Sequence, residues 1–343
     1  MLDKKSIAKI KEELDSCKNP LFFFDDDADG LSSFLLLYRY KQEGHGIIVK
    51  AKPSLNTSFL PKVNEYDPDK IFVVDVPLVD QEFIDAVHRP VIWIDHHDPV
   101  ERQGVSYFNP RSHDQKDQTC ITRICYEVVQ QDIWIAAVGA IADWQMPEFL
   151  PEVRQKYPGL AAGTTVGDIY FTSRLGILIK VFSFILKGNS SEVAKCFKIL
   201  TRIDDPEEIL QHQTPAGNYL LKRFEKVNGE YEQLLQEGLG HSSSKNELVF
   251  IYQENRNSFT GDLANELKYR FPDKLVVVGR EKSGEVRMSL RCDVAALAPA
   301  VQQALVGIEG YGGGHEHACG AAVKKHDFER FLENLRAALW VKG

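Results

Sequence analysis

The sequence lacks several features that would each define a class of protein. Its six cysteines are scattered and contain no Cys-x-x-Cys pair, which argues against a zinc ribbon or a secreted disulfide framework. The longest apolar stretch, residues 175–186, is interrupted by Lys180 and is too short to span a bilayer. Residues 1–18 are charged and amphipathic, without the apolar region of a signal peptide. We therefore expect a cytoplasmic protein without a membrane attachment.

The chain also lacks an excess of basic residues. Its 41 Lys and Arg stand against 49 Asp and Glu, and the acidic excess lies in residues 1–244. This balance excludes the broad basic surface of a tight duplex binder, although a few Arg, His and metal ions can still hold a phosphate. A length of 343 residues favours two domains, because one compact core seldom holds so many.

Apolar runs alternate with helical patterns in the first part of the chain. This alternation is typical of βαβ units and predicts an α/β domain with a parallel sheet. The helix expected at residues 4–16 would pack outside this domain, and helices dominate from residue 119 onward, including residues 133–143. The predicted strands are residues 21–24, 47–51, 71–75 and 91–95, and the helices between them include residues 31–40 and 81–87.

A second, smaller α/β domain is predicted at the C-terminus, joined to the first by a long polar helix at residues 215–238. Breakers and small polar residues at 238–244 mark the boundary. We expect a metal-binding domain at 1–210, a helical linker at 211–244 and a substrate-binding domain at 245–343. Its predicted elements are strands at 248–252, 275–279, 286–291 and near 321–323, helices at 261–270, 295–304 and from 328, and a glycine loop at 310–314.

Three of the apolar runs stop abruptly at a carboxylate, namely Asp25, Asp75 and Asp95. Ligands of open α/β sheets bind outside the carboxyl ends of the strands, so these side chains are expected to meet in one crevice. Crowded carboxylates either shift their pKa values steeply or hold cations. We favour cations.

The first carboxylate cluster has the pattern Asp25-x-Asp27-x-Asp29-Gly30. An EF-hand loop opens in the same way, but it needs a glutamate at its twelfth position, where this chain has Leu36. A purely structural alternative is that one aspartate caps the following helix. One aspartate suffices for that, and four in five positions would repel one another, so a metal site is the better interpretation.

The second cluster, Asp95-His96-His97, is weak evidence alone, because a histidine pair also occurs on ordinary surfaces. Asp143 strengthens it, since this residue ends an apolar segment where a buried unpaired carboxylate would be costly. Carboxylates mixed with imidazole suit Mn²⁺ or Mg²⁺ better than a thiolate-bound metal. Cys120 and Met146 are expected to lie in the core.

Together these motifs resemble, in order, the four motifs of the DHH phosphoesterase superfamily. Residues 312–320, with 289–291 before them, resemble the DHH-associated substrate-binding domain of RecJ-type exonucleases and nanoRNase-type phosphodiesterases. The resemblance implies two Mn²⁺ ions, with Mg²⁺ as an alternative, one held by His96, Asp143, Asp29 and a bridging Asp75, the other by Asp27 and Asp75. It further implies that Asp95 orients its neighbours and that His97 contacts the scissile phosphate.

One departure concerns the first motif, where the family has a histidine two or four residues before its first aspartate. Those positions here are Asp25 and Phe23, so either Asp25 replaces the ligand or the first metal site is weakened. The family also contains members that lost metal ligands and serve as structural subunits of replication assemblies. Retention of the other ligands favours an enzyme.

The resemblance therefore implies a Mn²⁺-dependent phosphodiesterase or exonuclease acting on single-stranded DNA, RNA or short oligonucleotides, with replication or repair proteins as possible partners. The alternatives are a phosphodiesterase for cyclic dinucleotides or nucleotide phosphates, and a metal-poor structural subunit. A phosphate is expected to contact the glycines and nearby cations. These candidate substrate-binding residues are Arg111, Arg291, Gly312, Gly313, Gly314 and His315.

Overall fold

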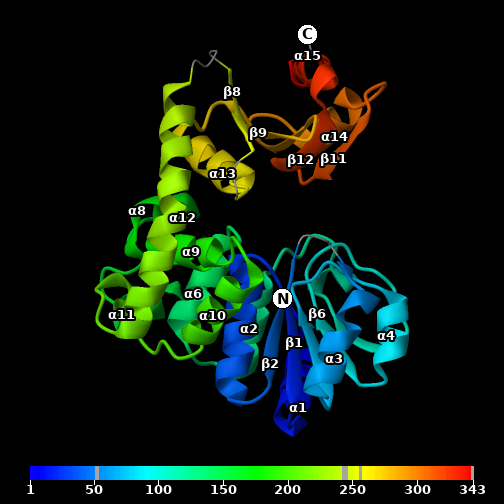
Figure 1. Ribbon diagram of the computed structural model, residues 1–343, viewed down its shortest axis with the longest axis vertical. Helices are drawn as coiled ribbons and strands as arrows, with labels where there is room; N and C mark the ends of the chain where they lie inside the picture. The colour runs from blue at the N-terminus through cyan, green and yellow to red at the C-terminus, as the bar shows by residue number, and fades with distance from the viewer. Residues whose placement is uncertain (51–53, 242–245, 255–256, 341–343) are drawn as a thin grey trace. The chain divides into compact units, whose positions relative to one another are not determined.

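The computed structural model describes residues 1–50, 54–241, 246–254 and 257–340, which form two compact units, residues 1–224 and 225–343 (Figure 1). The division falls inside α12 (Pro215–Gly240), a 26-residue helix that covers the range predicted as one long helix. The junction expected at residues 244 and 245 lies outside the described residues, as does Ala51 at the end of a predicted strand. No helix among the described residues is long and apolar enough to cross a membrane.

The first unit is built on a five-stranded parallel sheet with the order β2-β1-β4-β6-β7. The predicted parallel α/β fold is thereby confirmed. Its strands are β1 (Pro20–Asp25), β2 (His45–Val49), β4 (Lys70–Val74), β6 (Val91–Ile94) and β7 (Val105–Phe108), beside a two-stranded pair of β3 (Ser54–Leu55) and β5 (Leu78–Val79). Its helices are α1 (Lys4–Ser16), α2 (Ala28–Lys41), α3 (Leu60–Tyr66), α4 (Gln81–Val87), α5 (Ile121–Val129), α6 (Ile133–Ala142), α7 (Leu150–Lys156), α8 (Val166–Thr172), α9 (Arg174–Ile185), α10 (Ser190–Leu200) and α11 (Glu207–Leu210), with short 3₁₀ turns at Thr57–Phe59 and Pro110–Ser112.

Helices cover both faces of this sheet, as the apolar strand β1 illustrates. Successive side chains of a strand point to opposite faces. Phe24 stacks on Phe34 of α2 with ring centroids 4.6 Å apart, whereas Phe23 packs edge to face against Phe83 of α4 at 5.8 Å. The strand is therefore apolar throughout because neither face meets water. Figure 1 shows α2 beside β1, with α3 and α4 grouped together beside the sheet.

The second unit carries a mixed five-stranded sheet with the order β11-β12-β10-β9-β8, in which only β8 and β9 pair in parallel. One hydrophobic cluster lies between this sheet and two helices, α14 and α15, and a third helix, α13, packs against β9 and β10. Its elements are β8 (Glu247–Gln253), α13 (Thr260–Arg270), β9 (Leu275–Lys282), β10 (Glu285–Arg291), α14 (Leu297–Ala304), β11 (Gly310–Gly314), β12 (Ala318–Lys324), a 3₁₀ turn at Lys325–Asp327 and α15 (Phe328–Leu339).

The glycine segment is a strand, so the predicted loop at 310–314 is wrong. Gly310 to Gly314 pair antiparallel with residues 319–323 of β12 and form the edge of the sheet. A Cβ on Gly312 would lie 2.9 Å from the Cβ of Ala321, so the missing side chain lets the two strands approach. Small residues on both strands thus favour pairing over the turn that glycines suggest.

Candidate metal centre

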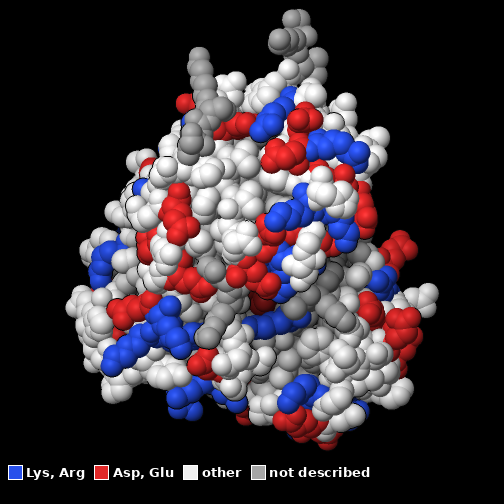
Figure 2. All heavy atoms as spheres, turned by 45° about the horizontal axis from the view of Figure 1, so that its top comes forward, with Lys and Arg blue, Asp and Glu red and all other residues white. Residues whose placement is uncertain are grey.

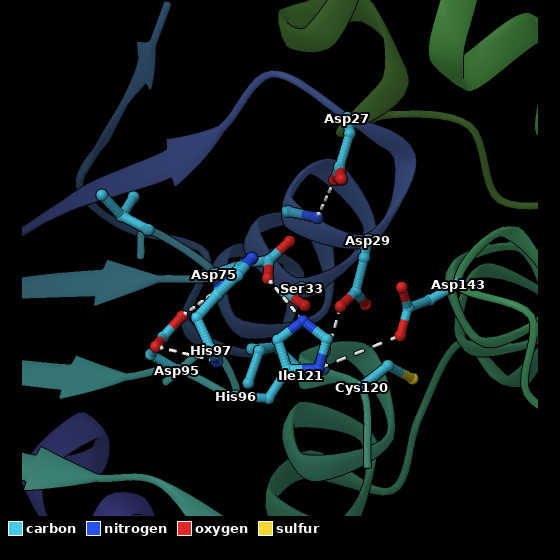
Figure 3. A network of polar contacts seen from close by, with 12 residues as sticks. Asp27, Asp29, Ser33, Asp75, Asp95, His96, His97, Cys120, Ile121 and Asp143 are labelled. Carbon is cyan, nitrogen blue, oxygen red and sulfur yellow. Dashed lines mark hydrogen bonds and ion pairs between the residues drawn. The ribbon is translucent and has the colours of Figure 1, made fainter. Parts of the chain in front are cut away.

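Carboxylates from separate strands meet at the carboxyl end of the parallel sheet, as the sequence predicts. Asp25 is the last residue of β1, while Asp75 and Asp95 directly follow β4 and β6. Ligand atoms of Asp25, Asp27 and Asp75 lie within 4.8 Å of one another, and so do those of Asp75 with His96 and His97. Figure 3 shows Asp75, Asp29 and Asp143 around the His96 ring.

Gly30 explains how the first motif reaches the site. A Cβ at this position would lie 2.8 Å from the backbone N and O of Asp25. Only glycine therefore lets the start of α2 pack directly against the end of β1. Asp27 caps α2 by accepting a 2.9 Å hydrogen bond from the Gly30 amide, so the capping role considered for one aspartate is real and falls to Asp27.

Asp29 is buried on α2 and holds the beginning of α5. Its carboxylate accepts hydrogen bonds from the amides of Ile121, at 2.9 Å, and Thr122, at 2.8 Å. These amides belong to the first turn of a helix, where they lack helical partners and favour a negative charge. Each oxygen keeps a further lone pair that a cation can use. Asp29 therefore links two helices at the site.

Asp75 is the most constrained of these carboxylates. It is 2% exposed, and its backbone has φ of +60°, a left-handed conformation that marks functional positions when the surroundings enforce it. Its Oδ1 atom lacks a hydrogen-bond partner among the described residues and lies 3.4 Å from His96 Nε2. Burial, together with the charges of Asp29, Asp27 and Asp25, raises the pKa of Asp75 well above its usual value.

Three further carboxylates, Asp25, Asp27 and Asp143, also resist ionisation in the absence of a counter-charge. Burial and the neighbouring Asp27 and Asp26 raise the pKa of Asp25 to about 8. Asp27 has an exposed surface, yet shielding from bulk water and the charge of Asp29 raise its pKa to about 6. Burial and the charges of Asp29 and Asp27 likewise raise the pKa of Asp143. A bound cation would reverse this repulsion.

The two histidines have different surroundings. His96 lies between Asp75 and Asp143, whose Oδ2 is 3.9 Å from its Nδ1, and burial lowers its pKa. His97 Nδ1 lies 2.8 Å from the Oδ1 of the fully buried Asp95, which also accepts the His97 backbone N–H at 3.0 Å. Burial would lower the pKa of His97, but the hydrogen bond to Asp95 and the charges of Asp95, Asp25 and Asp27 together outweigh it and raise the pKa.

Two residues near the site were not predicted to have a role there. Cys120 is buried, as expected, but its Sγ atom belongs to a group with Asp29 and Asp143 whose ligand atoms lie within 4.8 Å of one another. Asn109 donates 3.0 and 3.4 Å hydrogen bonds to His97 O and Asp95 Oδ2. A cysteine before an apolar helix and an asparagine before a proline are too common to signal such roles.

The predicted substrate-binding residues lie in both units. Arg111, in the first, forms a 2.8 Å ion pair with Asp98, next to His97. Arg291, in the second, stands opposite Ala318 in the β10–β12 register, while the His315 amide donates to Ala318 O at 2.9 Å. Arg291 and His315 therefore lie at the same end of one sheet, next to Gly314 of β11. Gly312 and Gly313 lie farther along the same edge strand.

Comparison with known families identifies the class of this protein. A profile described as the DHH family, N-terminal domain, matches residues 21–150, and another described as the DHHA1 domain matches residues 248–340. The chain therefore belongs to the DHH superfamily and carries its DHHA1 domain, as the motifs indicate. No curated protein sequence matches the chain significantly.

Solved structures share this fold at low sequence identity. RecJ from Thermus thermophilus, in complex with Mn²⁺, is 18% identical, with a TM-score of 0.64 over 97% of this chain and 54% of the other. An exonuclease RecJ bound to manganese is 18% identical, with a TM-score of 0.55 over 97% and 93%. The pGpG-specific phosphodiesterase PggH from Vibrio cholerae is 14% identical, with a TM-score of 0.51 over 95% and 100%. The chain thus spans about half of the Thermus RecJ chain.

Proposed function

We propose that the protein is a Mn²⁺-dependent phosphodiesterase that releases nucleotides from single-stranded DNA, RNA or short oligonucleotides. The observation that carries this proposal is the buried Oδ1 atom of Asp75, which lies 3.4 Å from His96 Nε2 among the other carboxylates and has no hydrogen-bond partner among the described residues. A buried carboxylate oxygen without a partner is costly unless a cation completes it. Membership of the DHH superfamily supports phosphodiester hydrolysis as the reaction.

The residues at the site fit two hard divalent cations. Asp25, Asp27 and Asp75 would hold one, and Asp25 would take the place of the family histidine. His96, Asp29 and Asp143 would hold the other, with Asp75 shared between both. Carboxylate oxygens with one imidazole suit Mn²⁺ and tolerate Mg²⁺. Bound cations of this kind polarise a phosphodiester and lower the pKa of water.

His97 would contact the scissile phosphate. Asp95 accepts from the Nδ1 side of its ring, so Nε2 is left to face the substrate. The ring keeps 41% of its side-chain surface exposed, whereas Asp95 is fully buried. Asp95 would therefore act by orienting His97, and the raised pKa favours the charged ring that donates to a phosphate oxygen.

Substrate grip would come from cations outside the carboxylate cluster. Arg111 would meet a phosphate near His97, and Arg291 with His315 would bind a phosphate at the glycine edge of the sheet in the second unit. On the face drawn in Figure 2, Lys and Arg side chains lie interspersed with Asp and Glu. This pattern and the net charge of −8 fit a short or loosely held strand better than a long duplex.

A second candidate is a phosphodiesterase for dinucleotides such as pGpG. The specific observation in its favour is the acidic balance of the chain, because a net charge of −8 suits a short substrate with few phosphates better than a long strand. Both candidates require the same metal chemistry and differ in how far the substrate extends beyond the scissile bond.

The deciding experiment is digestion of end-labelled DNA and RNA oligomers of two to twenty or so nucleotides, with Mn²⁺, with Mg²⁺ and with a chelator. Processive shortening of the longer oligomers supports an exonuclease, while cleavage confined to dimers supports the second candidate. Absence of hydrolysis of every substrate at saturating Mn²⁺ would contradict both and favour a structural role. Asp75→Asn serves as the inactive control.

A further inference from the structure

The helix that delivers Asp143 ends in an unusual way. The amide of Gln145 donates to Ala140 O at 2.9 Å, and the amide of Trp144 donates to Ile141 O at 3.1 Å. This pair of bonds is the Schellman motif, whose left-handed position is usually glycine because a side chain there is strained. Here the position is Trp144, with φ of +59°. The sequence thus places a large aromatic residue where local backbone preference disfavours it.

The Trp144 ring is both supported and exposed. It stacks on Tyr170 of α8, with ring centroids 5.8 Å apart and planes at 22°, and it also contacts Phe171 at 6.1 Å. Trp144 nevertheless keeps 45% of its surface exposed to solvent. Met146, expected in the core, is instead 40% exposed, so that expectation is wrong and the apolar surface continues past Trp144.

This surface follows a residue of the metal centre directly in the chain. Trp144 follows Asp143 directly, and consecutive Cα atoms are about 3.8 Å apart. The Oδ2 atom of Asp143 lies 3.9 Å from His96 Nδ1. The carboxylate of Asp143 also forms one of the candidate ligand groups, together with Asp29 and Cys120. An exposed aromatic ring thus stands one residue from a carboxylate of the centre, a spacing that suits a base whose phosphate is bound there.

We propose that Trp144, braced by Tyr170 and Phe171, is the stacking platform for the nucleobase next to the scissile phosphate. The inference rests on the proposed function and adds how the substrate is recognised. Stacking on an aromatic ring accepts any base, because every base has a π-face. It also supplies affinity without positive charge, which suits an acidic chain.

Trp144→Gly is the sharpest test, because glycine is the residue that the left-handed position prefers and the helix end should remain intact. Loss of one base stack should raise KM about 5- to 150-fold for a trinucleotide. Trp144→Phe keeps an aromatic face and should retain most of the affinity. Trp340→Phe, at the end of α15, is the matched control for loss of a tryptophan and should behave as the wild type.

The substrate series separates stacking from indirect effects. The series consists of three trinucleotides, each of which lacks a different base. On the trinucleotide that lacks the stacked base, wild type and Trp144→Gly should have equal KM. If Trp144→Gly matches wild type on the intact trinucleotide, or is impaired equally on every abasic version, Trp144 does not stack on a base and the inference is overturned.

A binding readout keeps the inference separate from the proposed function. Adenosine 5′-monophosphate with Mn²⁺ should quench the tryptophan fluorescence of wild type and Trp340→Phe, but not that of Trp144→Phe. Quenching without hydrolysis of any oligonucleotide would overturn the proposed function and leave the platform standing. Hydrolysis without this quenching, and with no effect of Trp144→Gly, would overturn the platform alone. If Trp144 instead binds a protein, quenching by the nucleotide is absent and the inference likewise fails.

Discussion

The Asp75→Asn substitution should make the protein more stable than wild type without metal and less stable than wild type with bound metal. Without metal, the Asp75 carboxylate is buried among Asp25, Asp27 and Asp29, and its Oδ1 atom has no hydrogen-bond partner among the described residues. Asparagine has nearly the same shape, carries no charge and can donate to the neighbouring carboxylates. The variant should therefore be more stable than wild type in a chelator.

The expected size follows from the cost of the orphaned atom. An unsatisfied buried polar group costs about 1–3 kcal/mol, which Asp75→Asn should recover in the free energy of unfolding. In a unit of this size, each kcal/mol shifts Tm by about 2–4 °C. With Mn²⁺ at one hundred times its Kd, wild type should gain about 2.7 kcal/mol for each site that binds. The variant loses the shared ligand and should gain much less, so the order of stability reverses.

The assay is thermal unfolding of both proteins in a chelator and across a Mn²⁺ titration, with hydrolysis measured in parallel. The variant should retain less than a tenth of wild-type activity at saturating Mn²⁺. A variant that is less stable than wild type in the chelator, or that gains as much from Mn²⁺, would refute the assignment of Asp75 as the shared ligand.

Three further predictions concern other parts of the chain. Asp25→Ala should need more Mn²⁺ for half-maximal activity, and an unchanged metal titration would show that Asp25 is not a ligand. Arg291→Ala should raise KM about 10- to 150-fold on an oligomer, because charge-assisted hydrogen bonds to phosphate are worth about 1.5–3 kcal/mol. The same variant should leave the KM for a mononucleotide ester unchanged, and Arg287→Ala, at an exposed position of the same strand, is the control. Burial would raise the pKa of Asp69, but hydrogen bonds from Cys17 Sγ and the amides of residues 18 and 19 lower it to about 2. The ionised Asp69 carboxylate therefore stabilises the folded protein above pH 4, and this stabilisation is lost as the pH falls through 2. Because Asp69 is exposed, Asp69→Asn should cost only about 1 kcal/mol at neutral pH in urea unfolding, and a difference from wild type that is as large at pH 2 would contradict this account.

Periodicity and strand ends made the first unit predictable from the sequence. A buried parallel strand reads as an unbroken apolar run, and β1, β4 and β6 were all located from such runs. The carboxylates after β1 and β4 meet in the structure, because parallel strands end at one edge of the sheet, whereas the Asp95 carboxylate after β6 is hydrogen-bonded to His97. Asp25 and Asp75 were placed together by this geometry, whereas Asp27 was added from the Asp-x-Asp pattern and the family resemblance.

Other features depend on tertiary packing that leaves little trace in the sequence. β7 is an edge strand whose residues are partly exposed, so Val105 to Phe108 lack the apolar signal of the inner strands. The glycines at 310–314 suggested a turn, whereas pairing with small residues of β12 makes them a strand. The position of Cys120 beside Asp29 depends on how α5 packs on α2, which no local pattern specifies.

The amides that Asp29 holds also make the metal centre observable from the backbone. The N–H groups of Ile121 and Thr122 point at its two oxygens, so their electronic surroundings depend on how much charge that carboxylate carries. A diamagnetic ion such as Mg²⁺ withdraws this charge, and the two amide resonances of a ¹⁵N-labelled sample would then move together. Occupancy of the site can thus be followed without substrate, turnover or a coloured metal. The signal comes from two adjacent residues of α5, a helix that supplies none of the proposed metal ligands.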